Sequence, residues 1–383
     1  MRRTITGVTA VLCAVIVGCG PGERRGTLDS AGQVDAIPLD APLFSISEGT
    51  SPVPWALNLA EAGTILQNGA SVVVNYNESL ALVLDTAGDL LYRTGRRGQG
   101  PGEFNGGVGK VFSVGAGFGA WDLSSRRFSF FDSNGQFTHA FSLSDWRFAQ
   151  PIAWMHGHGL FVTEYGFEPG QQREFVLVDT MGAFRFRIYG PSAPPHFFIR
   201  YRDERGRFSS IMTGFDCTPS LFPAAIADAF YVAHSGTGTI YRYGLDGTSG
   251  TIYQETNRQT VTNDVLRLVQ ARYSMAPSDS FLSYLRAIGS PGDPLPTWSE
   301  VLTDDLLGLF LLLETRCGSS LQDASTWAVI SNAGEFLGRV LVPPASKVLA
   351  ARGGRVLLVR RDDLGVEFAE LYALPREVVS TRN

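Results

Sequence analysis

His156 and His158 are the residues whose types and spacing come nearest to a metal site. Residues two apart on a strand project from the same face, so both imidazoles could bind one zinc ion. However, the chain has only five histidines, and no acidic residue lies close to this pair in the sequence. We therefore interpret both as loop or strand-end residues, and we predict no metal ion and no other cofactor.

Four arginines in the run RYRDERGR form a second group that could bind a ligand. They are Arg200, Arg202, Arg205 and Arg207. Guanidinium groups bind carboxylates and phosphates through paired hydrogen bonds. However, Asp203 and Glu204 interrupt the run, and mixed charges are also typical of a solvated loop. Two interpretations stay open: a solvated loop, or a site for an anionic group such as an acidic glycan.

The glycine-rich run of residues 95–107 is not a nucleotide-binding motif. A phosphate-binding loop would need glycine in place of Phe104 and serine or threonine in place of Val111. A dinucleotide-binding loop would need glycine in place of Glu103. We interpret these glycines as residues that let a connection pass close to its neighbour.

The acidic residues and the serines form no calcium-binding or catalytic motif. Asp132, Asp304 and Asp305 lack the Asp-x-Asp-x-Asp-Gly order of a calcium loop, so we interpret them as turn residues. No serine stands in Gly-x-Ser-x-Gly, the sequence around a hydrolase nucleophile. We therefore predict no catalytic residue.

The N-terminus has the three parts of a secretory signal: two arginines, an apolar stretch over residues 5–17, and a small residue, Gly18. This stretch is shorter than the roughly 20 residues that span a bilayer, so we predict that residues 1–18 are removed. The sequence Ile16-Val17-Gly18-Cys19 resembles the bacterial lipobox, and the resemblance implies that Cys19 is lipidated. Gly20 replaces the aspartate that retains some lipoproteins at the inner membrane, which favours the outer membrane of a bacterial envelope.

Charge excludes one class of partner. Removal of residues 1–18 takes away two arginines and no acidic residue, so the formal net charge changes from −5 to −7. An acidic chain lacks the basic field that nucleic acid requires. The chain has 30 arginines and only two lysines, which we interpret as genome composition rather than as a binding role.

Two cysteines remain for pairing if Cys19 carries lipid. Cys217 and Cys317 could form a disulfide in an oxidising compartment and close a loop of 100 residues. Such a bridge is worth about 4–5 kcal/mol in the chain-entropy model. The sequence leaves open whether the two Cα atoms approach within bonding range.

A repeated pattern organises the rest of the chain. Residues 19–40 lack apolar periodicity and are predicted to form a flexible tether. Beyond them, apolar runs are joined by turns of the form Asp-x-x-Gly or a close variant, which indicates β-hairpins. The turn glycines are separated by 47, 47, 65 and 87 positions, which indicates one repeating unit with insertions. They are Gly88, Gly135, Gly182, Gly247 and Gly334.

A unit of about 45 residues with several strands is typical of a β-propeller blade. The last unit, residues 354–377, lacks an outer strand, which residues 41–47 could supply to close the ring. We therefore predict an all-β, six-bladed β-propeller over residues 41–377, followed by a tail of residues 378–383. Residues 258–297 predict a helical insertion between blades four and five, with a first helix capped by Asn263 or Asp264 and a second that ends at Gly289.

Residues 95–107 and 118–137 resemble the NHL-type repeat of six-bladed propellers. They resemble still more closely the bacterial six-bladed propeller lipoproteins, whose blades are joined by Gly-x-Gly-Pro-Gly-Glu-Phe. The resemblance covers residues 90–140 in detail and the rest in pattern, and it implies a fold more than a reaction. The matching residues are Gly98, Gly100, Pro101, Gly102, Glu103, Phe104, Asp122, Arg127 and Phe131.

Three functions remain. The first is a lipid-anchored extracytoplasmic module that binds a protein, peptide or glycan. The second is a propeller enzyme, lactonase- or lyase-like, with its site at the mouth of the central channel. The third is a structural subunit of an envelope complex. Because the sequence shows no clear set of catalytic acids and histidines, we favour the binding module.

Overall fold

The computed structural model describes residues 26–27, 35–47, 60–76, 78–144, 150–163, 171–192, 197–202, 208–213, 217–272, 288–315, 317 and 323–379. The predicted signal peptide, the lipidation site Cys19, and Arg205 and Arg207 lie outside these residues. In the part of the chain so described, no helix has the length and apolar character needed to cross a membrane.

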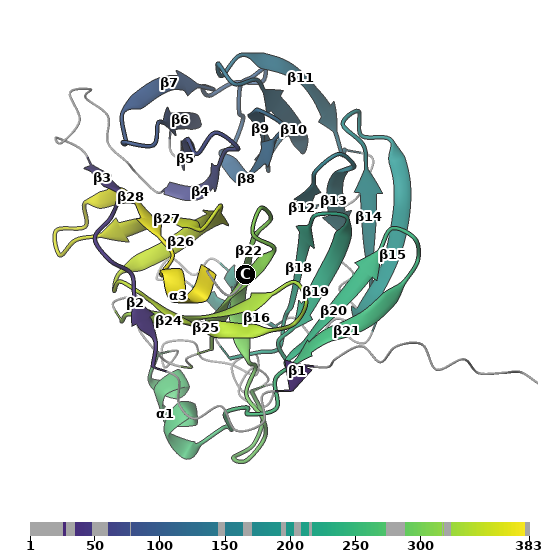
Figure 1. Ribbon diagram of the computed structural model, residues 1–383, viewed down its shortest axis with the longest axis vertical. Coiled ribbons are helices and arrows are strands. Elements are labelled where there is room, and N and C mark those ends of the chain that lie inside the picture. Colours follow the sequence, from purple (N-terminus) through teal and green to yellow (C-terminus); the bar gives the residue numbers. More distant parts are fainter. Residues whose placement is uncertain are drawn as a thin grey trace, which may run out of the picture.

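Six sheets surround a central axis (Figure 1), and each has four antiparallel strands in order from the axis outwards; a short parallel strand adds a fifth to two of the sheets. The first three sheets lie consecutively in the sequence. The first has β4 (Ala60–Ile65), β5 (Ser71–Asn75), β6 (Leu80–Leu84) and β7 (Leu90–Thr94). The second has β8 (Val108–Val114), β9 (Gly117–Asp122), β10 (Arg127–Phe131) and β11 (Phe137–Ser142). The third has β12 (Gln150–Met155), β13 (Gly159–Thr163), β14 (Gln172–Val178) and β15 (Phe184–Ser192).

The other three sheets complete the circle. The fourth has β18 (Leu221–Ile226), β19 (Ala229–His234), β20 (Thr239–Gly244) and β21 (Ser249–Gln254). The fifth has β22 (Trp298–Asp304), β23 (Leu309–Glu314), β24 (Ser325–Ser331) and β25 (Phe336–Val342). The sixth has β26 (Ser346–Arg352), β27 (Arg355–Arg361), β28 (Glu367–Ala373) and β3 (Phe44–Ser47).

The sheets form a closed ring. Each inner strand contacts the inner strands of both neighbouring sheets, and β26 of the last sheet contacts β4 of the first. The second strands are buried on both faces because each sheet packs between two others; all five residues of β5 are buried. The predicted six-bladed β-propeller is therefore confirmed, and its apolar cores lie between adjacent sheets.

The two ends of the propeller meet in the sixth sheet. Strand β3 pairs antiparallel with β28, from Phe368 opposite Ser47 to Leu371 opposite Phe44. The hydroxyl of Ser45 donates a 2.9 Å hydrogen bond to the buried carboxylate of Glu370. The closing strand is thus held by side chains as well as by the backbone ladder.

Two more short strands precede β3, within residues 19–40, for which the sequence predicts a flexible tether. Strand β1 (Gly26–Thr27) pairs parallel with β21, and β2 (Ile37–Pro38) pairs parallel with β25. Leu39 is buried, and its N–H donates to the carbonyl of Leu341. The described part of this segment therefore lies along the outer strands of the fourth and fifth sheets.

The glycine-rich motif of residues 95–107 forms the connection between the first and second sheets. The N–H of Gly100 donates to the carboxylate of Glu103, and Phe104 is fully buried between the two sheets. Arg127 donates to the carbonyls of Gln99 and Glu103. These contacts give the motif a structural role.

Two insertions interrupt the repeat. A hairpin of β16 (Phe197–Arg202) and β17 (Phe208–Thr213) lies between β15 and β18. Helix α1 (Asn263–Arg272) lies between β21 and β22, within the predicted helical insertion. Its capping side chain is Thr262, whose hydroxyl accepts the N–H of Val265. The second predicted helix falls outside the described residues except at its end, and a short helix α3 (Arg376–Val379) packs on β25.

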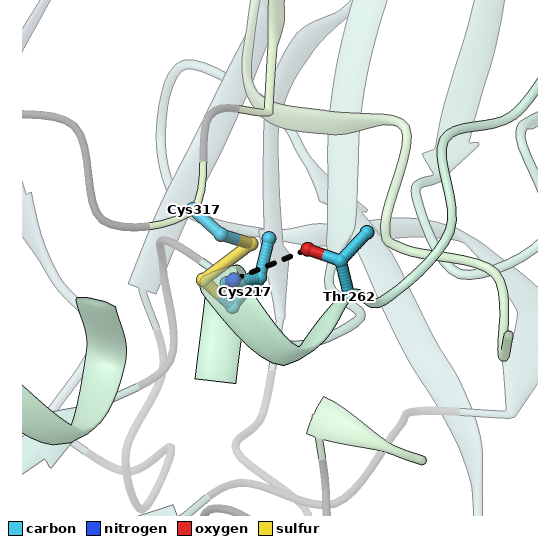
Figure 2. Close-up of a disulfide and its surroundings, with 4 residues drawn as sticks. Cys217, Thr262 and Cys317 are labelled. Carbon is cyan, nitrogen blue, oxygen red and sulfur yellow. Dashed lines mark hydrogen bonds between the residues drawn. A yellow bond between two sulfur atoms is a disulfide. The ribbon is translucent and has the colours of Figure 1, made fainter. Parts of the chain in front are cut away.

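A disulfide joins Cys217, which precedes β18, to Cys317, which follows β23 (Figure 2). Their Cα atoms are 5.3 Å apart, and the bridge spans 100 residues of sequence. Cys217 is buried with Val261 and Val269, so the bridge belongs to the small core beneath α1.

Candidate functional site

The inner strands give the ring two distinct faces. Each sheet begins with its inner strand, and its antiparallel outer strand returns the chain to the face where the next inner strand begins. All six inner strands therefore run in one direction. We call the face where they begin the start face and the opposite face the end face.

A cavity of about 860 Å³ lies on the axis and is lined by the inner strands of all six sheets. Apolar residues such as Phe112, Trp154 and Phe222 are part of its lining, and their side chains also pack against the cores between the sheets. A volume of this size is typical of a ligand site. The charged residues of the lining are Lys110, His156, Arg173, Glu300, Asp305, Lys347 and Arg352.

Three of these residues join across the channel at the end face. His156 follows β12, Asp305 follows β22 and Arg352 ends β26, so they come from the third, fifth and sixth sheets. His156 Nε2 lies 2.7 Å from Asp305 Oδ2, and Arg352 Nη2 lies 3.1 Å from the same oxygen. Both terminal nitrogens of Arg352 also lie 3.4 Å from His156 Nε2. We call these three residues the end-face bridge.

In the end-face bridge, the negative charge of Asp305 balances the positive charge of the buried Arg352. The side chain of Arg352 is 5% exposed and that of Asp305 is 18% exposed. Burial alone would raise the pKa of Asp305, but the hydrogen bond from His156 and the charge of Arg352 lower it below its ordinary value. Because Asp305 is then an anion, its Oδ2 accepts a hydrogen bond from the Nε2–H group of His156, and this bond fixes the orientation of the imidazole ring.

Three other charged residues lie near the start face. Lys110 is the third residue of β8, Glu300 the third of β22 and Lys347 the second of β26. The second and fifth sheets are opposite in a ring of six, so Lys110 and Glu300 project from opposite walls of the channel. Lys347 comes from the sheet beside that of Glu300. We call these residues the start-face cluster.

Burial in the channel shifts the pKa values of two members of the start-face cluster, Glu300 and Lys110. Burial in the channel wall raises the pKa of Glu300 to about 7, although Lys347 and Lys110 both act to lower it. The side chain of Lys110 is exposed to the channel, but the surrounding walls lower its pKa, an effect that Glu300 opposes. Perturbed groups in a cavity mark a functional-site candidate.

Lys110 and Lys347 are also the only lysines in the chain. All other basic residues are arginines, yet both lysines line the one channel. From the sequence we interpreted the scarcity of lysine as genome composition, but the two lysines that are present both line the candidate site. Their rarity was a signal in the sequence, although nothing in their spacing showed that they lie in one cavity.

The insertions attach to the start face. The hairpin β16–β17 and helix α1 each occupy a connection from an outer strand to the next inner strand. Cys217 precedes an inner strand and Cys317 follows the second strand of its sheet, so the disulfide ties connections on this same face. Arg200 and Arg202 belong to β16, opposite Ser210 and Phe208 in the hairpin.

The histidine pair does not act as a unit. His156 joins the end-face bridge, whereas His158 is exposed and does not line the cavity. Within the described residues, no three side chains of His, Cys, Asp or Glu gather as a metal site would need. Asp304 is a turn acid, as expected, and accepts the N–H groups of Leu306 and Leu307. The interpretation of Asp305 as a turn acid was wrong, because its carboxylate crosses the channel to His156.

Comparison with known proteins supports the fold. No protein-family model and no curated protein matches the sequence. A solved structure of a Bacteroides fragilis protein named as exported has a TM-score of 0.51 and 10% identity, over 89% of this chain and 99% of that one. A member of the DUF4221 family from Bacteroides vulgatus has a TM-score of 0.50 and 9% identity, over 82% of this chain and 92% of that one. At such low identity, the likeness shows the propeller fold alone.

Proposed function

We propose that the protein is a lipid-anchored, extracytoplasmic binding module of the bacterial envelope that takes part of a peptide ligand into its central channel. The observation that carries this proposal is the cavity of about 860 Å³ with its mixed lining. Aromatic and aliphatic side chains can take up apolar residues, while the start-face cluster can fix an ionised group. Of the partners expected from the sequence, a protein, a peptide or a glycan, a peptide combines these two features best.

The anchor and the location follow from the N-terminus. Ile16-Val17-Gly18-Cys19 has the lipobox pattern, and Gly20 favours the outer membrane. Several acyl chains on one cysteine make detachment negligible, since each buried CH₂ contributes about 0.8 kcal/mol.

Labelling with a radioactive fatty acid tests the anchor. Cells that express the wild-type protein should incorporate label into it, and the Cys19→Ala variant should carry none. An unlabelled wild-type protein, or a labelled variant, would remove the lipid anchor from the proposal.

Photo-crosslinking in intact cells tests the channel. A benzophenone side chain replaces Phe112, which lines the channel, or Phe184, which is 54% exposed on outer strand β15. We expect mass spectrometry to find peptide adducts at position 112 and none at position 184. Adducts at position 184 alone, or the same adducts at both, would place binding outside the channel.

A second candidate function is a lactonase- or lyase-like enzyme at the channel mouth. The hydrogen bond from His156 to Asp305 favours it, because an oriented imidazole is the arrangement that general-base catalysis uses. Turnover of a lactone by the purified protein, lost on His156→Gln, would favour this candidate over the binding module.

A further inference from the structure

The start-face cluster differs from the other charged groups of the channel in its exposure. Arg173 and Arg352 also line the cavity, but they are only 8% and 5% exposed. Lys110 and Lys347 expose their side chains to the channel. A ligand that enters the cavity therefore meets ammonium groups, and an ammonium group is a compact charge with three N–H donors.

The net charge of the start-face cluster determines which ligands it can attract. While both lysines are protonated, two ammonium groups and a single carboxyl group give the cluster a net positive charge, whether or not Glu300 is ionised. Such a cluster repels a metal cation or an amino group and attracts an anion. Because hydrogen bonds to charged groups are stronger in an enclosed channel than in water, a compact anion would be held firmly.

The opposite end of the channel restricts how a peptide can enter. The end-face bridge joins the third, fifth and sixth sheets across the axis. A chain that entered from the start face would meet this bridge before it reached the opposite face, which favours insertion of one end of a peptide over threading. Of the two ends, only the carboxyl terminus carries the charge that the lysines attract.

We propose that Lys110, Lys347 and Glu300 form a binding site for the C-terminal carboxylate of a peptide ligand. This inference rests on the proposed function of the channel. The carboxylate would accept hydrogen bonds from the two ammonium groups. The side chain of the last residue would point deeper, towards Phe112 and Trp154, and the preceding residues would lie towards the start face.

Glu300 gives the site a dependence on pH. Its pKa is raised to about 7, so below pH 7 the group becomes neutral and no longer competes with the ligand for the lysines. Above pH 7 its negative charge competes for the same lysines and repels the ligand. A peptide carboxylate has a pKa near 3.5 and stays ionised throughout. Affinity should therefore fall as the pH rises from 6 to 8.5.

The test uses a mixture of N-acetylated random pentapeptides, made once with a free carboxyl terminus and once as C-terminal amides. At pH 6, immobilised protein should retain the free-carboxyl mixture at least tenfold better than the amides. Lys110→Met and Lys347→Met should each weaken retention about tenfold, the effect of losing one charged hydrogen bond. Arg267→Met is the matched control, because Arg267 is an exposed cation on α1 outside the channel.

Each outcome separates the inference from the function on which it rests. If the free-carboxyl and amide mixtures were retained equally, and the two lysine variants retained them as the wild-type protein does, the carboxylate site would be wrong. Binding of peptides by the channel would still stand. Retention of neither mixture would contradict both the carboxylate site and the proposed function.

Acetylation by acetic anhydride gives a second measurement that needs no variant, since Lys110 and Lys347 carry the only side-chain amines of the chain. Bound free-carboxyl peptides should slow acetylation of both lysines, and the amides should not.

The pH arm compares Glu300 with two other titratable groups of the channel, Lys110 and His156. Burial lowers the pKa of Lys110, so loss of its charge would also weaken binding as the pH rises. The wild-type protein should lose about tenfold in affinity between pH 6 and 8.5, as expected for one nearby charge. Glu300→Gln should lose less affinity than the wild-type protein over the same range, because only Lys110 then changes charge in the cluster. His156→Gln should keep the wild-type dependence, because His156 lies at the other end, with Asp305 and Arg352. A pH dependence in Glu300→Gln as large as that of the wild-type protein would remove Glu300 from the site.

Discussion

Replacing both Cys217 and Cys317 with alanine is expected to lower the free energy of unfolding by about 4–5 kcal/mol. The bridge closes a loop of 100 residues, and in the chain-entropy model such a cross-link removes that much conformational freedom from the unfolded chain. The buried position of Cys217 beneath α1 adds a smaller loss of packing. Denaturant unfolding under non-reducing conditions measures the difference.

Reduction of the wild-type protein provides the control. In the presence of a reductant, the wild-type protein and the double variant should unfold at nearly the same denaturant concentration. The account of the bridge would be contradicted if the double variant were as stable as the oxidised wild-type protein.

The second large effect is expected at the end-face bridge. Asp305→Ala leaves the guanidinium of Arg352, which is 5% exposed, without its carboxylate. Removing one partner of a buried ion pair costs about 3–5 kcal/mol, because the remaining charge is uncompensated. The pKa of Asp305 is lowered in the folded state, so this stabilisation is present above the carboxyl pKa of the unfolded chain, about 3.9, and is lost as the pH falls below it.

A double variant distinguishes a buried pair from a general loss of structure. Asp305→Ala combined with Arg352→Met removes both charges, so it should recover most of the stability that Asp305→Ala alone loses. Asp264→Ala is a matched control, because Asp264 pairs with Arg267 on the surface of α1 and should cost less than about 1 kcal/mol. Losses in the double variant that equal the sum of its two single variants would contradict the pairing.

The architecture could be predicted from the sequence because the chemistry of its turns is local. At each of the turn glycines the backbone has a positive φ, 91° at Gly88 and 75° at Gly135, and the preceding Asp85 and Asp132 accept backbone N–H groups within the turn. These signals lie within four or five residues of one another. Repetition of such a turn with a spacing of 47 then indicates a propeller blade.

The site could not be predicted in the same way, because its members meet only when the ring closes. His156 and Arg352 are 196 positions apart in the sequence and yet lie 3.4 Å from each other. His156 lacked an acidic neighbour in the sequence, but the structure supplies one from the fifth sheet, Asp305. For Lys110 and Lys347, the sequence showed that lysine is rare in this chain, but it did not show that the two residues line the same cavity.

In the helical insertion, the sequence was sufficient to predict a helix but not to identify the side chain that caps it. The sequence placed a first helix near Asn263 and Asp264, and α1 begins at Asn263. Its capping hydroxyl belongs to Thr262, one residue earlier. Helix boundaries depend on which side chain reaches the free N–H groups, and the sequence offered three adjacent residues able to do so.

The rate at which acetic anhydride modifies Lys110 and Lys347 tests most directly whether the channel holds the carboxyl end of a peptide. We predict that pentapeptides with a free carboxyl terminus slow acetylation of both lysines at pH 6, whereas the corresponding amides leave both rates unchanged. Equal rates with free-carboxyl peptides, with amides and with no peptide would contradict the account.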